Sequence, residues 1–347
     1  MPTEVLEVMM NATDTPWLIT NDDSSSLFRL FSSTLKQNFF MYKPFKPLRG
    51  SFIVGSFKGC LVIRSPVKIF ILNIFSRFQI QLPPRTTMPQ FLKSKINASN
   101  VKQDYPLTLA MSTCGSFSPL ILAGVTFLGD LVWCNIGDKE WKGYRDDDDY
   151  GNLTFYNDML YAITRDGTRI DMFRIQDRLV KLDAIACPNP TVPPSEYMDV
   201  YLVDCKGTLV VAKRYYYTSQ GHTIAFHLFK VQGNVVVDLD NLGDQALFVS
   251  TGLSAECVTA KDCKGLENPN RLFFIGRSED GLKYEFGMVS VERKRNRLFR
   301  VTLPHTTMHS SPFWLLPRFA SACDCKCHDP TLWTTKAKCQ LHTNLES

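Results

Sequence analysis

Residues 153–175 read LTFYNDMLYAITRDGTRIDMFRI, a series of apolar runs separated by short polar segments. The apolar side chains of the first runs fall on one parity, as a half-buried β-strand requires, and they are Leu153, Phe155, Met159, Tyr161 and Ile163. The dipeptide Asp166-Gly167 favours a two-residue hairpin, because a type I′ turn needs positive φ at both central positions. This stretch therefore predicts antiparallel strands joined by tight turns.

Hairpins of the same form recur along the chain. Turns are predicted at Ile136-Gly137-Asp138, Lys206-Gly207 and Gln232-Gly233-Asn234, each between two apolar runs. Residues 283–303, KYEFGMVSVERKRNRLFRVTL, predict a further hairpin. Its apolar parity shifts after Gly287, which indicates a β-bulge.

Two β architectures fit a pattern of hairpins that continues over most of a 347-residue chain. A sandwich with long loops uses fewer strands than the pattern supplies, whereas radially repeated four-stranded blades of ~40–50 residues account for the spacing. We expect an all-β fold, a β-propeller of roughly six or seven four-stranded blades. The propeller spans residues 16–317, between a short leader at 1–15 and a Cys-rich tail at 318–347 that we expect to be flexible.

Charge and hydropathy argue against nucleic acid and membrane as partners. The 39 basic and 34 acidic residues nearly balance, at a net charge of +5, and they are scattered along the chain. The basic cluster at residues 293–297 lies between strand-like runs, which is more typical of a solvated hairpin turn than of a nuclear-import signal or phosphate patch. No stretch approaches the ~18 apolar residues of a membrane span, and the best run, Leu120 to Leu128, is expected to be a buried strand pair.

Cysteine usage indicates a reducing compartment, the cytosol or the nucleus, where disulfides are rare. The 11 cysteines are thinly spread, and the first residues, MPTEVLEVMM, lack the apolar region of a signal peptide. Cys60, Cys134 and Cys205 lie inside apolar runs, where a free cysteine behaves as a small buried hydrophobe. Three N-glycosylation patterns are then expected to be chance matches, at Asn11, Asn97 and Asn152.

We expect no catalytic site and no cofactor, and therefore no enzyme. The sequence lacks a P-loop, a G-x-G-x-x-G, an H-E-x-x-H and a G-x-S-x-G motif. Asp130, Asp158 and Asp204 each lie beside a predicted turn, and nothing pairs them as the carboxylates of a glycosidase are paired. Residues 146–149, four consecutive aspartates, are more typical of a solvated loop between blades than of a Ca²⁺ site, whose ligands alternate.

The tail is the one segment with a set of candidate metal ligands. Zn²⁺ takes four thiolate or imidazole ligands in a tetrahedron, and the candidates are Cys323, Cys325, Cys327, His328, Cys339 and His342. Their spacing is tighter than that of zinc-finger pairs, in which two intervening residues let both sulfurs face one ion. A flexible tail without metal is therefore favoured over a structural zinc site.

A series of motifs runs through residues 16–317. They are Pro16-Trp17-Leu18, GSFKGCLVI at 55–63, LNIFSRFQIQLPP at 72–84, the stretch at 153–175, YLVDCKGTLVVAKR at 201–214, LGDQALFVSTG at 242–252 and GLENPNRLFFI at 265–275. In this order they resemble the plant F-box-associated β-propeller family of the KIB type. That family usually has Leu-Asn-Pro where Ile74 follows Asn73 here, and it generally has a Trp shortly before the Leu-Gly-Asp, where this chain reads VVVDLDN.

The resemblance implies a non-enzymatic protein-recognition module, similar to the substrate receptor of a ubiquitin ligase, with protein partners at one propeller face. Many relatives carry an F-box, which binds a Skp-type adaptor, before the propeller. Residues 2–10, PTEVLEVMM, resemble only its first helix, so we expect the F-box to be incomplete and leave the Skp-type adaptor open. Two alternatives stay open as well: a propeller enzyme or small-molecule or glycan binder that uses the central channel, and a degenerate family copy without function.

Overall fold

The computed structural model describes most of the strands' backbone and many of the turns between them. Within that part of the chain there is no α-helix, only the short 3-10 turns η1 (Arg85–Thr87) and η3 (Ala260–Asp262), and no helix there is long and apolar enough to cross a membrane. The described residues are 17–21, 27–32, 37–42, 51–57, 59–65, 68–74, 79–89, 106–112, 120–144, 147–190, 197–217, 223–250, 254–262, 269–277, 284–291, 297–302 and 313–315. The predicted leader and tail lie outside them.

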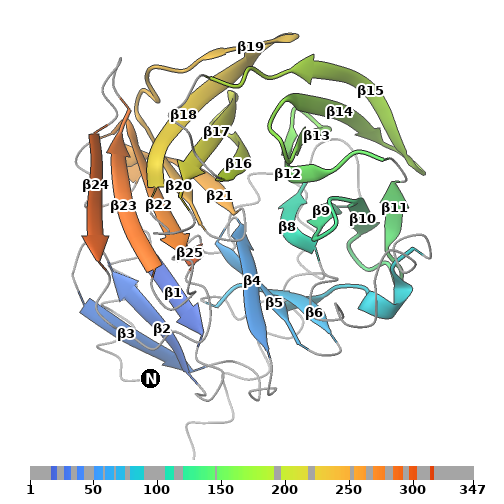
Figure 1. The fold of residues 1–347 in the computed structure, drawn as a ribbon. Helices are drawn as coiled ribbons and strands as arrows, with labels where there is room; N and C mark the ends of the chain where they lie inside the picture. Colours follow the sequence, from blue (N-terminus) through green and yellow to red (C-terminus); the bar gives the residue numbers. More distant parts are fainter. Residues whose placement is uncertain are drawn as a thin grey trace, which may run out of the picture.

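Six sheets form a ring around a central axis, which Figure 1 shows from one end. The first blade contains β4 (Phe52–Phe57), β5 (Cys60–Arg64), β6 (Ile69–Leu72) and β7 (Gln79–Gln81). The second contains β8 (Pro106–Met111), β9 (Ile121–Thr126), β10 (Leu131–Asn135) and β11 (Lys142–Tyr144). The third contains β12 (Tyr150–Tyr156), β13 (Met159–Thr164), β14 (Arg169–Ile175) and β15 (Leu179–Ala186).

The fourth blade contains β16 (Tyr197–Asp204), β17 (Leu209–Tyr216), β18 (Thr223–Gln232) and β19 (Val235–Asp238). The fifth contains β20 (Gln245–Val249), β21 (Ala255–Thr259), β22 (Arg271–Arg277), β23 (Tyr284–Ser290) and β24 (Arg297–Thr302). The sixth combines β25 (Phe313–Leu315) with β1 (Trp17–Asn21), β2 (Leu27–Ser32) and β3 (Gln37–Tyr42). The predicted propeller is confirmed with six blades, and the sandwich alternative is wrong.

The sixth blade closes the ring by joining the two ends of the described chain. Strand β25 pairs antiparallel with β1, so that Trp17 lies opposite Leu315 and Ile19 lies opposite Phe313. These four side chains are buried in one cluster with residues of the first blade. Closure therefore removes two free sheet edges and buries apolar surface in the same contact.

The fifth blade departs from the regular four-strand pattern. Its order is β21-β20-β22-β23-β24, and β20 runs parallel to β22 while it pairs antiparallel with β21. Strand β21 is the innermost of the five and contacts β16 and β4 of other blades. The inserted strand is β20, which carries the central QALFV of the LGDQALFVSTG motif.

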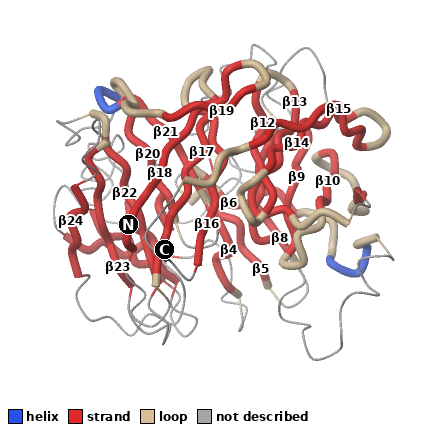
Figure 2. Tube along the Cα trace, turned by 45° about the horizontal axis from the view of Figure 1, so that its top comes forward, coloured by secondary structure: helices blue, strands red, loops and turns tan. Residues whose placement is uncertain are grey.

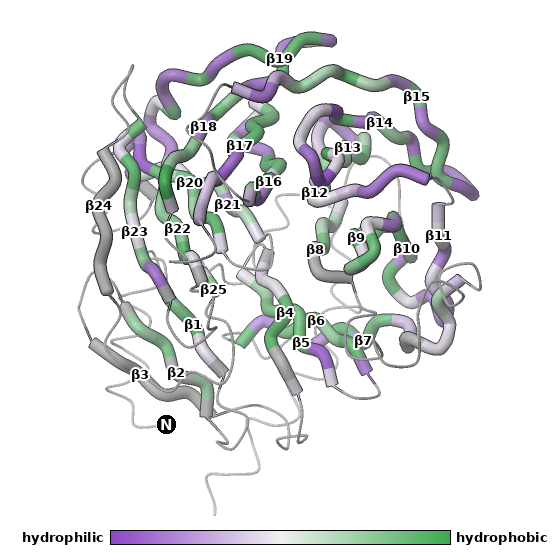
Figure 3. The backbone as a smooth tube through the Cα atoms, viewed as in Figure 1, coloured by the Kyte–Doolittle hydropathy of each residue, from purple (hydrophilic) through white to green (hydrophobic). Residues whose placement is uncertain are grey.

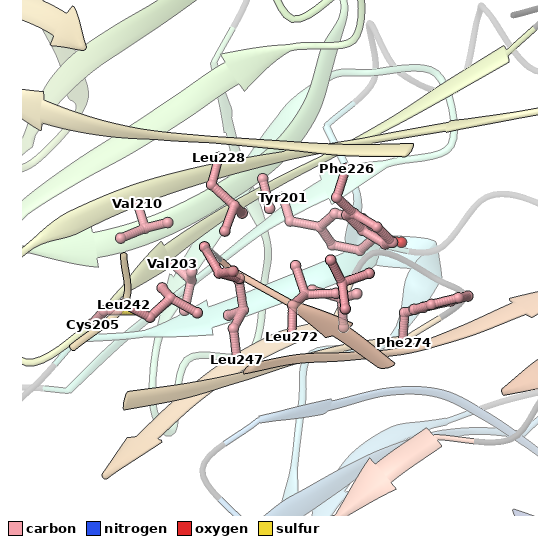
Figure 4. Packing of buried hydrophobic residues seen from close by; sticks show 14 residues of the cluster. Tyr201, Val203, Cys205, Val210, Phe226, Leu228, Leu242, Leu247, Leu272 and Phe274 are labelled. Carbon is pink, nitrogen blue, oxygen red and sulfur yellow. The ribbon is translucent and has the colours of Figure 1, made fainter. Parts of the chain in front are cut away.

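The described core consists of clusters that lie between neighbouring blades around the whole ring. Figure 4 shows the cluster between the fourth and fifth blades, where Tyr201 and Phe226 face Leu272 and Phe274. In Figure 3, β9 and β10 are largely hydrophobic, whereas β15 at the rim carries long polar segments. Since each blade packs between two others, most strands are buried on both faces.

This packing corrects the expected half-buried strand in residues 153–175. In β13, Tyr161 and Ile163 are buried, as their parity predicts, but Leu160 and Ala162 on the opposite parity are buried too. The two parities enter different interblade clusters. The alternation of apolar residues correctly predicted a strand, but it wrongly predicted that one face of this strand is exposed.

The turns also differ in one respect from the prediction. Lys206 and Gly207 both have positive φ, +47° and +86°, and form the predicted tight turn between β16 and β17. The Asp166-Gly167 hairpin is present, but only Gly167 has positive φ there. Positive φ at two successive residues occurs instead at Asn157 and Asp158, between β12 and β13. Asx side chains tolerate this left-handed conformation, so Asn-Asp fulfils the role that Asp-Gly was expected to play.

Two further expectations about strands are wrong. Leu120 to Leu128 is not a strand pair, because it forms the single strand β9 and then a turn. No bulge occurs at Gly287, because β23 keeps a regular register with both neighbouring strands. Gly287 lies opposite Phe274, and a Cβ atom built on it would meet the Phe274 ring at 2.1 Å. The apolar parity shifts at Gly287 because the Phe274 ring, rather than a side chain of residue 287, fills this position of the strand.

Cysteine pairing corrects the expectation that Cys205 is free. Cys205 forms a disulfide with Cys257, and their Cα atoms lie 5.2 Å apart. Cys60 and Cys134 are free, as expected. Burial raises the pKa of the Cys60 thiol to about 11 and that of Cys134 to about 12, so both stay protonated near neutral pH.

We expect Gly287→Ala to lower the free energy of unfolding by about 1–3 kcal/mol, because the methyl group must displace the buried Phe274 ring. Urea unfolding of the full chain measures the change. In a Phe274→Leu background the same substitution should cost clearly less, because the ring is gone. An equal cost in both backgrounds would contradict the contact between Gly287 and Phe274.

Candidate protein-binding face

The connections between strands form the two faces of the ring, at opposite ends of the strands in the tilted view of Figure 2. Because successive strands of blades two to four are antiparallel, their turns alternate between these faces. We call the face with the Asn157-Asp158 turn the β12–β13 face. The opposite face, with the turn at residues 165–168, is the β13–β14 face.

The three candidate carboxylates are divided between the two faces. Asp158 and Asp204 lie at turns of the β12–β13 face, whereas Asp130 lies at the β9–β10 turn on the opposite face. The Asp204 carboxylate accepts a hydrogen bond from the Gly207 amide at 2.9 Å, which fixes its own turn. Asp130 therefore does not face either of the other two as the paired carboxylates of a glycosidase do.

No group of three or more His, Cys, Asp or Glu side chains within the described ranges is arranged to hold a metal ion. The six tail residues that are candidate zinc ligands lie outside those ranges, so the zinc site stays untested. Of the four consecutive aspartates, the structure describes Asp147, Asp148 and Asp149.

These aspartates are not a simple solvated loop, because two of them form ion pairs in the third blade. Asp149 pairs with Arg165 at 2.9 Å. Asp148 pairs with Arg169 and with Lys181, and both of those cations also pair with the fully buried Asp171. The hydrogen bonds that Arg169 donates to the Asp148 and Asp171 carboxylates raise the pKa of its guanidinium. The described part of the run lies between the second and third blades and is bound by ion pairs to strands of the third blade.

The β13–β14 face carries an exposed aromatic side chain at the start of β16. Tyr197 is 52% exposed. Its ring stacks on that of Tyr216, with centroids 6.0 Å apart and planes 24° apart. The Arg214 guanidinium lies 4.6 Å from the centroid of the Tyr216 ring. Two tyrosines and one arginine thus form a contiguous group, which we call the Tyr197 stack.

Arg214 is buried, at 2% exposed, and its partners hold the guanidinium in place. It donates hydrogen bonds to Asp199 at 3.0 Å and to Thr223 at 2.9 Å. Glu285 of the fifth blade lies 3.9 Å away and accepts hydrogen bonds from Thr223. Burial disfavours the charged form, but the Asp199 and Glu285 carboxylates more than offset it and raise the pKa of Arg214. The stack therefore rests on a charged group that cannot move without breaking contacts between two blades.

The neighbouring residue, Lys213, is fully buried on the other side of β17. Its ammonium donates to the Gly167 and Pro188 carbonyls and to the Asn189 side chain, each at 2.7 Å. Burial lowers the pKa of Lys213. This side chain ties the Gly167 turn to the start of the connection that leads into β16, where Tyr197 lies.

The sequence motif at 201–214 indicated this part of the chain but not Tyr197. The tyrosines after this motif have different surroundings, because Tyr215 is buried and Tyr216 stacks on Tyr197. Tyr197 was not singled out, because its stacking partner lies on the paired strand. The adjacent Lys213-Arg214 in an otherwise apolar strand was the available signal, since buried cations require specific partners.

We expect Lys213→Met to lower the free energy of unfolding by roughly 2–4 kcal/mol, because the buried acceptors of its three hydrogen bonds lose their donor. Urea unfolding measures the loss, and Lys230→Met at a partly exposed position of β18 is the matched control. Equal stability of the two variants would contradict the role given to Lys213.

A likeness to known proteins covers most of the chain. Residues 27–301 match the family model described as the KIB1-4 β-propeller. The chain is 25% identical to a probable F-box protein of Arabidopsis thaliana in an alignment of 271 positions that covers 70% of this chain and 70% of that protein.

Similar solved structures include a putative 6-phosphogluconolactonase from Bacteroides fragilis, at 12% identity and a TM-score of 0.40, with 86% of this chain and 84% of that chain covered. The N-terminal domain of Nup159 is similar at 10% identity and a TM-score of 0.39, with 86% and 82% covered. The family model matches most of the sequence, and the chain folds as a propeller of six blades. The chain therefore belongs to the KIB1-4 β-propeller family.

Proposed function

We propose that this protein is a non-enzymatic protein-recognition module that binds its partner on the β13–β14 face, around the Tyr197 stack. The observation that carries the proposal is a half-exposed tyrosine, Tyr197, stacked on Tyr216, whose ring in turn packs against the buried charged Arg214. A tyrosine in a preset position contributes contact area at a low cost in side-chain entropy.

Further features of the same face support this assignment. Phe127 and Leu128, at the β9–β10 turn, are 40% and 39% exposed. Arg165 donates to the Phe127 carbonyl at 3.0 Å and so fixes that turn. Aromatic residues and arginine are enriched at the centres of protein interfaces. A closed propeller supplies a rigid scaffold on which such residues keep their positions.

The family membership extends the proposal to a biological role. The chain is similar in sequence to a probable F-box protein, and we infer a role as a substrate receptor, located in the cytosol or nucleus. Binding at the Tyr197 stack requires no F-box in the same chain. Engagement of a Skp-type adaptor is therefore a separate question from partner recognition.

The test is affinity purification of the tagged full-length chain from a plant-cell extract, with partners quantified by mass spectrometry. We expect Tyr197→Ala to reduce recovery of a specific partner at least about tenfold, the range of an interface hot spot. The control is Val235→Ala, which removes a side chain that is 57% exposed on the rim strand β19. Equal recovery with both variants would contradict the proposed face, and no partner above background would contradict the recognition function itself.

A further inference from the structure

The Cys205–Cys257 disulfide joins two blades at a structurally irregular place. Cys205 follows the end of β16 in the fourth blade, and Cys257 is the central residue of β21 in the fifth. The two cysteines are 52 positions apart in sequence. The bond therefore connects the innermost strands of neighbouring blades.

Strand β21 lies at the inner edge of its sheet and pairs with a single neighbour. It is separated from β22 by the inserted strand β20, and its ladder consists of five residue pairs with β20. Toward the centre of the ring it contacts β16 and β4 without being paired to them. A covalent bond to the fourth blade therefore restrains a strand that has one hydrogen-bonded neighbour.

The pair lies close to the β12–β13 face. Cys205 is buried but adjoins the exposed turn residues Lys206 and Gly207, and Cys257 is partly exposed. Cys60, Cys134 and Cys187 are free. Burial raises the pKa of these three thiols, which disfavours the thiolate that attacks in disulfide exchange. Among the described cysteines, Cys205 and Cys257 are the two whose Cα atoms, 5.2 Å apart, are placed for a disulfide.

We propose that Cys205 and Cys257 form a reversible redox switch that fastens β21 to the fourth blade when the bond is closed and releases it when the bond is reduced. The oxidant is glutathione disulfide: the two thiols lose two electrons and two protons as the S–S bond forms, and two molecules of glutathione are produced. In a reducing compartment the dithiol form prevails, and a shift of the glutathione pool toward its disulfide closes the bond.

The experiment equilibrates the full-length chain in glutathione buffers of increasing disulfide fraction, traps free thiols by alkylation and identifies linked peptides by mass spectrometry. We expect one reversible transition, in which the Cys205–Cys257 peptide pair appears. The closed form should melt higher by roughly 5 °C, since the cross-link restrains a long loop of the unfolded chain. Amides of β21 should exchange more slowly with solvent in the closed form than in the open form.

Cys205→Ser and, independently, Cys257→Ser should abolish the dependence of Tm on the glutathione ratio, whereas Cys134→Ser should retain it. The proposal is overturned if the bond persists in fully reduced glutathione or never forms in fully oxidised glutathione. It is also overturned if β21 exchanges equally in both forms, or if the shift in Tm survives in both serine variants.

Discussion

Three residue pairs between β25 and β1 hold the two ends of the described chain in one sheet. Without them, the sixth blade loses its innermost strand and the cluster that contains Trp17, Ile19 and Phe313 is opened to water. The cluster of Leu18 and Trp314 also contains residues of this contact. The remaining clusters depend on it indirectly, because each blade is buried between two neighbours only while the ring is closed. The same contact explains why apolar residues occupy both faces of strands such as β13.

Within the closed ring, buried charges determine the geometry of one face. Lys213 and Arg214 are successive residues of β17, so their side chains point to opposite sides of the strand. Lys213 binds carbonyls at the junction with the third blade, and Arg214 lies beside Asp199 and Glu285 at the junction with the fifth. Each cation would be costly to bury without these partners. Together they fix the surroundings of Tyr197, and the same blade carries the disulfide near its other end.

Local patterns were sufficient for the parts of the fold that local forces determine. The turn at Lys206-Gly207 was predictable because glycine relieves the steric cost of positive φ. The pairing of Trp17 with Leu315, the insertion of β20 and the Cys205–Cys257 bond were not, because each joins segments far apart in sequence and has no local signature. The misjudged parity at Gly287 has the same origin, since the ring of Phe274 lies on the neighbouring strand. The stacking of Tyr197 was likewise not predictable from local sequence, because Tyr216 lies on the neighbouring strand.

Native-state hydrogen exchange of the full-length chain tests the role of ring closure most directly. If the pairing of β25 with β1 holds the propeller together, the amides of the facing residues Ile19 and Phe313 exchange only through global unfolding. Their free energy of exchange then equals that of β13 amides and the value from urea unfolding. A markedly lower value for Ile19 and Phe313, with β13 still fully protected, would show that the ring stays folded without its closure and would contradict this account.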